Sequence, residues 1–168
     1  MRILRREEGT PRMDDNIYRA IVYTHILAAM AWVGGAFFIQ LLGIRTARST
    51  DPQDLPKLGR QIEWFGMRYF LPVSIVTFVA GVILVSQRWQ FSQLWVSLAM
   101  LFWLVSVIIG ALYIGPRSKK VAEMFETLGA TAPEARAASA RLFMVSRIDL
   151  VLFFVIVGLM VWKPGSAT

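Results

Sequence analysis

The chain of 168 residues has no cysteine and a single histidine, His25. Without cysteine it cannot form disulfides, thiolate metal sites or cysteine nucleophiles. Its eight methionines are spread along the chain without close pairs, whereas a soft-metal site gathers its sulfur ligands. The chain also has no glycine-rich phosphate loop. These absences leave little room for metal, thiol or phosphoryl-transfer chemistry.

Charged residues are missing from long parts of the chain. Residues 20–44, 69–87 and 89–116 form runs of 25, 19 and 28 residues without Asp, Glu, Lys or Arg, and residues 150–162 form a shorter fourth run. A helix needs about 20 apolar residues to cross a bilayer, and 56% of the chain is hydrophobic. We therefore predict an all-α fold, a four-helix transmembrane bundle in the lipid bilayer.

The apolar runs divide the chain into a polar tail over residues 1–16 and one membrane domain over residues 17–164. Within this domain, Pro72 should bend the second helix, and Gly115–Pro116 should end the third. The four spans are expected near residues 17–44, 65–86, 94–115 and 142–162.

Basic residues predict the orientation. The loops after the first and third spans, with the approaches to the next spans, hold eleven of the 18 basic residues. The positive-inside rule places these loops in the cytoplasm and both termini on the outer, periplasmic side of a bacterial inner membrane. Four arginines in the tail oppose this orientation, and a translation start at Met13 would remove them. We therefore expect the basic residues behind the net charge of +7 to set the topology and to contact anionic lipid head groups, and not to bind nucleic acid.

The loop over residues 117–141 is expected to contain an amphipathic helix. Val121, Phe125 and Leu128 recur at helical spacing among charged residues, which predicts a short helix on the membrane surface that Gly129 ends. Residues 131–134 then resemble a helix start, with a capping hydroxyl and an early proline. The fourth helix is therefore expected to begin near Ala132 and to enter the membrane later.

Small residues indicate where helices can approach closely. Ala31 and Gly35 are four residues apart on the first helix, and Ser106 and Gly110 are four apart on the third. Such pairs are typical of packed membrane helices. Glycine and alanine are also simply frequent in such helices, so both interpretations stay open.

Asp149 is expected inside the fourth span, about 10 Å deep at 1.5 Å per residue. Arg147 can extend to the surface along its own stem, and two residues apart on a helix it is a poor partner for Asp149. Arg68 or Arg45, at the cytoplasmic ends of the second and first spans, can reach it instead. An ionisable group at this depth is either a functional group or a clamp between helices.

His25 lies about two turns inside the first span. There it can ligate haem iron, relay protons or hydrogen-bond to a neighbouring helix. A lone histidine gives no bis-histidine haem within one chain. His25 and Asp149 are also expected in opposite leaflets, which excludes a serine–histidine–aspartate triad.

Several short motifs resemble those of small four-helix bacterial membrane proteins. In the first helix, the segment from His25 through Trp32 to Gly34–Gly35 resembles the opening helix of an integral membrane family of unknown function and of the copper-resistance D membrane domain. The unknown-function family is also matched by Trp95, by the segment 113–116 and by the ending at residues 160–164. The resemblance covers residues 17–164 and implies a four-helix fold.

The first helix is more distantly similar to that of the small membrane protoporphyrinogen oxidase. That resemblance implies that His25 matches a histidine involved in haem binding. The lysine expected on the third helix is missing, because Ser97, Ala99 and Met100 occupy that region. The resemblance implies haem b as the cofactor. Because the lysine is missing, it does not imply that the chain has the oxidase activity.

Three functions follow from these observations. The first is a non-enzymatic accessory or scaffold subunit of a membrane complex, or a small homo-oligomer, since small-residue faces and few buried polar groups favour association. The second is a haem- or tetrapyrrole-binding redox protein that uses His25. The third is an oligomeric transporter or channel.

Overall fold

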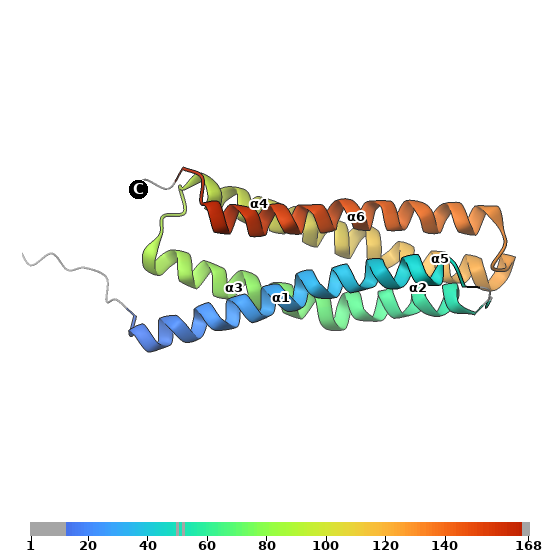
Figure 1. Ribbon diagram of the computed structural model, residues 1–168, viewed down its shortest axis with the longest axis horizontal. Helices are drawn as coiled ribbons and strands as arrows, with labels where there is room; N and C mark the ends of the chain where they lie inside the picture. Colours follow the sequence, from blue (N-terminus) through green and yellow to red (C-terminus); the bar gives the residue numbers. More distant parts are fainter. Residues whose placement is uncertain (1–12, 50, 52, 166–168) are drawn as a thin grey trace, which may run out of the picture.

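The computed structural model describes residues 13–49, 51 and 53–165 and contains no strand in this part of the chain (Figure 1). The first of four long helices is α1 (Asp15–Thr46), and the last is α6 (Pro133–Trp162). Two further helices of 35 residues lie between them. One joins α2 (Asp54–Phe65), the π-helix η1 (Gly66–Phe70) and α3 (Leu71–Arg88). The other joins α4 (Leu94–Ile108), the π-helix η2 (Ile109–Ile114) and α5 (Gly115–Leu128).

All four long helices are apolar and long enough to cross a membrane, which confirms the predicted four-helix transmembrane bundle. α1 packs mainly on α3, α4 on α6, and α2 on α5. The start of α1 and the end of α6 lie at one end of the bundle, and α2 and α5 lie toward the other (Figure 1). The side of the membrane that each end faces stays a prediction, and the proposed start at Met13 concerns residues 1–12, outside the described residues.

Gly115–Pro116 does not end the third helix, contrary to the expectation. The helix continues as α5, with Pro116 in its first turn. Proline is tolerated in the first turn of a helix, because the N–H that it lacks would have no hydrogen-bond partner there. The preceding turn is π-helical, and the Gly115 N–H donates to the Gly110 carbonyl, five residues earlier. Pro72 likewise lies in the first turn of α3, which follows η1 directly.

The amphipathic helix expected after the third span is present as part of α5, and part of its apolar face packs on other helices. Val121 and Phe125 are buried in a cluster with Ala135 and Leu142 of α6. α2 also covers α5, because residues 54–65, expected as loop, are helical. Leu128, the third residue of the predicted apolar face, is 56% exposed, so contact of this end of α5 with a membrane surface stays a prediction. α5 ends at Leu128, and Gly129 follows with a φ of 90°.

α6 begins at Pro133, one residue from the expected Ala132. Ala132 is the N-cap residue and supplies no side-chain hydrogen bond to the helix. The expected hydroxyl cap from Thr131 is therefore wrong. The proline alone marks this start, since its fixed φ suits the first helical turn.

The closest helix contacts lie at other glycines than those expected. A Cβ atom on Gly59 of α2 would lie 2.9 Å from the Ala122 Cβ and 3.0 Å from the Ser118 carbonyl oxygen, both on α5. A Cβ atom on Gly43 of α1 would overlap the Phe143 ring of α6. By contrast, a Cβ atom on Gly110 would meet nothing within 4 Å.

Candidate functional site: a cavity between the helices

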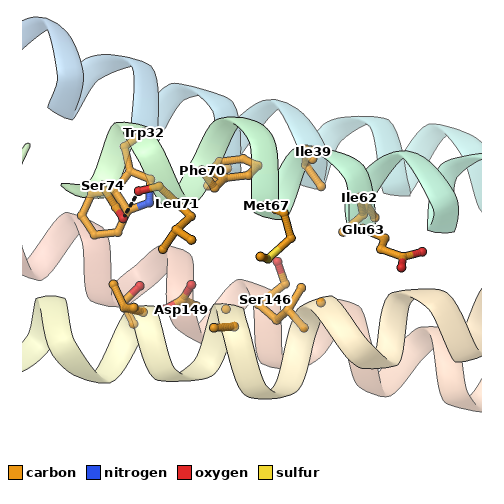
Figure 2. Close-up of a pocket in the computed structure, with 18 of the residues that line it drawn as sticks. Trp32, Ile39, Ile62, Glu63, Met67, Phe70, Leu71, Ser74, Ser146 and Asp149 are labelled. Atoms are coloured by element: carbon orange, nitrogen blue, oxygen red, sulfur yellow. Dashed lines mark hydrogen bonds between the residues drawn. The ribbon is translucent and has the colours of Figure 1, made fainter. Parts of the chain in front are cut away.

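A cavity of about 320 Å³ lies between the four long helices. Its walls come from α1, from η1 with the adjoining turns of α2 and α3, from η2 with the adjoining turns of α4 and α5, and from α6. Figure 2 shows its labelled side chains between the facing helices. A volume of about 300 Å³ is at the lower end of the range for small-molecule sites. The cavity is therefore large enough to hold a ligand.

The two π-helices face this cavity. Gly66, Met67 and Phe70 of η1 line it, as do Gly110 and Ile114 of η2. A π turn places an extra residue in the helix and occurs often at functional sites. Since η1 and η2 also contact each other, both irregular turns lie at the same level of the bundle.

Both π-helices have the same sequence pattern, which was not recognised from the sequence. Residues 66–72 and 110–116 each read Gly-x-x-Tyr-x-x-Pro. In each, a backbone N–H next to the proline donates to the carbonyl of the first glycine, from Leu71 to Gly66 and from Gly115 to Gly110. The proline cannot donate the next helical hydrogen bond, which helps to explain why the helix is irregular here. A search for this spacing would have located the walls of the cavity.

Asp149 is the most deeply buried acidic group of the cavity wall. Its exposed fraction is 7%, and its Oδ1 atom has no hydrogen-bond partner. The Ser106 hydroxyl of α4 is the polar group beside this carboxylate. Figure 2 shows Asp149 on the wall opposite Leu71 and Met67. A buried carboxylate oxygen without a hydrogen bond is costly, and Asp149 is the one charged side chain among the buried residues that the structure describes.

Other polar groups of the wall are partly engaged within the protein. The Ser74 hydroxyl donates to the Leu71 carbonyl at 2.9 Å. The Gln40 Nε2 atom of α1 donates to the Ser146 hydroxyl of α6 at 2.7 Å, while the Gln40 Oε1 atom has no partner. Ser146 thus links α1 to α6 at the cavity wall.

Arg68 and Arg147 do not pair with Asp149. Arg68 is exposed, and its guanidinium lies 5.5 Å from the centre of the Trp64 ring. Arg147 is exposed on α6 and borders a separate hollow that Arg136 also lines. The two ion pairs formed by the described residues are Arg60–Glu126 and Arg88–Asp15. The clamp proposed for Asp149 therefore has no arginine partner in the described chain.

The expected small-residue pairs have different surroundings. At Gly35, a Cβ atom would lie 3.0 Å from the Tyr69 ring, and the Tyr69 hydroxyl donates to the Ala31 carbonyl at 3.0 Å. An aromatic ring, not a second helix backbone, thus covers the Ala31–Gly35 face. Ser106 and Gly110 both line the cavity, so this pair borders open space.

His25 lies outside the cavity wall and contacts α3. Its Nδ1 atom is 2.8 Å from the Thr77 carbonyl oxygen. A carbonyl oxygen only accepts hydrogen bonds, so Nδ1 carries the proton and donates it. A Cβ atom on Gly81 would lie 3.1 Å from its Cε1 atom. One edge of the imidazole is therefore packed against α3. This arrangement joins α1 to α3 through a side-chain hydrogen bond.

Haem binding by His25 stays a prediction from the sequence. The ring does not line the cavity described above, and its Nδ1–Cε1 edge packs against α3. In the region where the oxidase resemblance would place a lysine, Ala99 is buried and Met100 packs against the cluster of Val85, Trp95 and Val96.

His25→Phe should lower the stability of the protein, because it keeps a ring but removes the hydrogen bond to Thr77. We expect a loss of about 0.5–2 kcal/mol in thermal unfolding in detergent. Thr24→Val, next to it on an exposed part of α1, is the control and should have a smaller effect. An absorption spectrum with a Soret band that His25→Phe removes would contradict the purely structural role.

The fold and the cavity define a polytopic membrane protein with a helical bundle. The chain belongs to the family described as "Predicted integral membrane protein (DUF2269)", whose model matches residues 19–164. No curated protein and no solved structure matches the chain. The family membership agrees with the resemblance to a membrane family of unknown function.

Proposed function

We propose that this protein is a non-enzymatic membrane protein that binds a small, mainly apolar molecule in the cavity between its helices. The observation that carries the proposal is the cavity of about 320 Å³ bordered by both π-helices. Helices that pack regularly leave few voids larger than a water molecule. Two irregular turns at one level keep this space open, at the cost of helix packing.

The composition of the wall favours an apolar ligand. Trp32 and Phe153 pack with ring centres 4.3 Å apart, and Phe70 adjoins them. Apolar walls with a few polar groups are typical of small-molecule sites. The described residues include no group of three or more His, Cys, Asp or Glu side chains that could hold a metal ion. Binding by shape and hydrophobic contact is thus the role that the site supports best.

Filling the cavity tests this proposal. Gly66 and Gly110 line it, and a Cβ atom on either would meet nothing within 4 Å. Gly66→Leu and Gly110→Leu should therefore occupy the space without a backbone clash. We expect wild-type protein in detergent to bind the neutral probe 4-phenylbutan-1-ol saturably by calorimetry, and each variant to weaken this binding at least about tenfold.

Gly34→Leu is the matched control. A Cβ atom there also meets nothing within 4 Å, but Gly34 does not line the cavity, so binding should be retained. If the wild-type protein shows no saturable binding beyond detergent partitioning, or if the control loses it equally, the proposal is wrong.

An accessory-subunit, scaffold or homo-oligomer role stays a prediction from the sequence, as does location in a bacterial inner membrane. A ligand-binding cavity is compatible with these roles, because a small subunit can hold a molecule for its partner. Cross-linking in native membranes followed by mass measurement tests them, and a monomer without cross-linked neighbours would contradict them.

A further inference from the structure

We infer that the cavity binds a small organic ammonium ion, with Asp149 as the group that recognises its charge. This inference rests on the proposed ligand-binding function and specifies the chemical class of the ligand. It combines three observations: a buried carboxylate with one unpartnered oxygen, aromatic side chains that line the same cavity, and a second carboxylate at one end of the cavity.

The carboxylate supplies the charge recognition. Asp149 is more than nine-tenths buried and its Oδ1 atom has no hydrogen-bond partner within the protein. The ion pairs that the described arginines make are Arg60–Glu126 and Arg88–Asp15, and neither includes Asp149. A buried anion is stabilised by a paired cation with hydrogen bonds. An ammonium N–H that donates to Oδ1 would provide both the charge and the missing hydrogen bond.

The aromatic side chains favour an organic cation over a metal ion. Trp32, Phe70 and Phe153 line the same cavity as Asp149. Aromatic faces attract ammonium groups and also accept apolar carbon atoms. A bare metal ion would need several oxygen ligands, and the described residues contain no group of three or more His, Cys, Asp or Glu side chains that could hold one. A cation with an apolar body therefore fits this wall best.

The second carboxylate indicates a route of entry. Glu63 of α2 lines the cavity and is half-buried, and Figure 2 shows it beyond Met67 and Ile62, at the α2 end. The Ser146 hydroxyl lies on the wall between the Glu63 end and Asp149 (Figure 2). Acidic groups that line one passage attract cations and raise their local concentration. The ammonium ion would therefore enter from the end of the bundle that holds α2 and α5.

A pair of matched probes tests the inference. 4-Phenylbutylamine is cationic at neutral pH and has nearly the same shape as the neutral 4-phenylbutan-1-ol. We expect wild-type protein in detergent to bind the amine about 30-fold more tightly than the alcohol, or better, as for a buried charge pair. Titration of Gly110→Leu with each probe measures partitioning into detergent.

Asp149→Asn should remove this preference. The amine should then exceed the alcohol by less than about fivefold, the effect of a solvated ion pair. Equal binding of both probes to wild-type protein would overturn the inference and leave the proposed function standing. If neither probe binds, the proposed function fails as well. The wild-type comparison decides between these outcomes even if the variant does not fold.

The ammonium group could also belong to a lipid. Repeating the amine titration in nanodiscs with and without phosphatidylethanolamine separates the two sources. Amine binding that is lost only with this lipid assigns the site to a lipid ammonium, and unchanged binding assigns it to a free amine. Both results support an ammonium site, whereas no amine preference in either nanodisc contradicts it.

Discussion

Asp149→Leu is expected to make the protein more stable, by about 1–3 kcal/mol, and to abolish its preference for an ammonium ligand. The native carboxylate is buried, with one oxygen unpartnered. Replacing it by an apolar side chain removes this unfavourable burial. The adjoining cavity of about 320 Å³ can take the larger leucine side chain. A gain in stability with a loss of binding would mark Asp149 as a functional group.

Thermal unfolding in detergent measures this change, with calorimetry of the amine on the same preparations. Ser106→Ala is a useful companion, because it removes the hydroxyl beside Asp149 but leaves the carboxylate in place. If Asp149→Leu and Asp149→Asn both unfold at lower temperature than wild type, the carboxylate is a clamp between helices. In that case Asp149 has a structural role and is not the group that recognises a ligand.

Gly59→Leu is expected to destabilise the bundle strongly, by about 1–3 kcal/mol or more. A Cβ atom at this position would lie 2.9 Å from the Ala122 Cβ and 3.0 Å from the Ser118 carbonyl oxygen. The Ser118 contact is with backbone, which cannot turn away as a long side chain can. α2 and α5 must therefore separate to accept a leucine, and the buried cluster around Phe125 should loosen with them.

Gly34→Leu is again the control, since its Cβ atom meets nothing within 4 Å. Both substitutions replace a helical glycine with the same residue, so the difference between their unfolding temperatures isolates the helix contact. Equal effects would show that α2 and α5 are not in close contact in the membrane protein. Proteolysis near residues 129–132 offers a second measurement, because separation of α2 from α5 should expose this turn.

Some of the site could be predicted from residues close together in the sequence. Asp149 stood out because it is an acidic residue expected inside an apolar span, and His25 because it is the sole histidine. The cavity was not predicted, although the repeated Gly-x-x-Tyr-x-x-Pro pattern at residues 66–72 and 110–116 marks both π-helices of its wall. Each proline was interpreted as a bend or a stop, because nothing in one helix shows that two π turns face each other.

The partners of these residues could not be predicted either. Arg68 was considered for Asp149 on the basis of depth in the membrane alone, yet its guanidinium lies beside Trp64. Depth gives the position along a helix but not the direction in which a side chain points. The close contacts of Gly59 and Gly43 were missed for the same reason, because glycine spacing does not reveal which helix lies opposite.

The sequence by itself determined that the chain has four apolar helices, because the lack of charge over long runs requires a lipid environment and satisfied backbone hydrogen bonds. It also determined that a carboxylate lies within the apolar part. Only the tertiary structure decided which faces meet, that α2 and α5 prolong the bundle, and that a cavity opens beside Asp149. The hydrophobicity of a segment determines whether it lies in lipid or in water. Which helices it contacts depends on how particular side chains pack together.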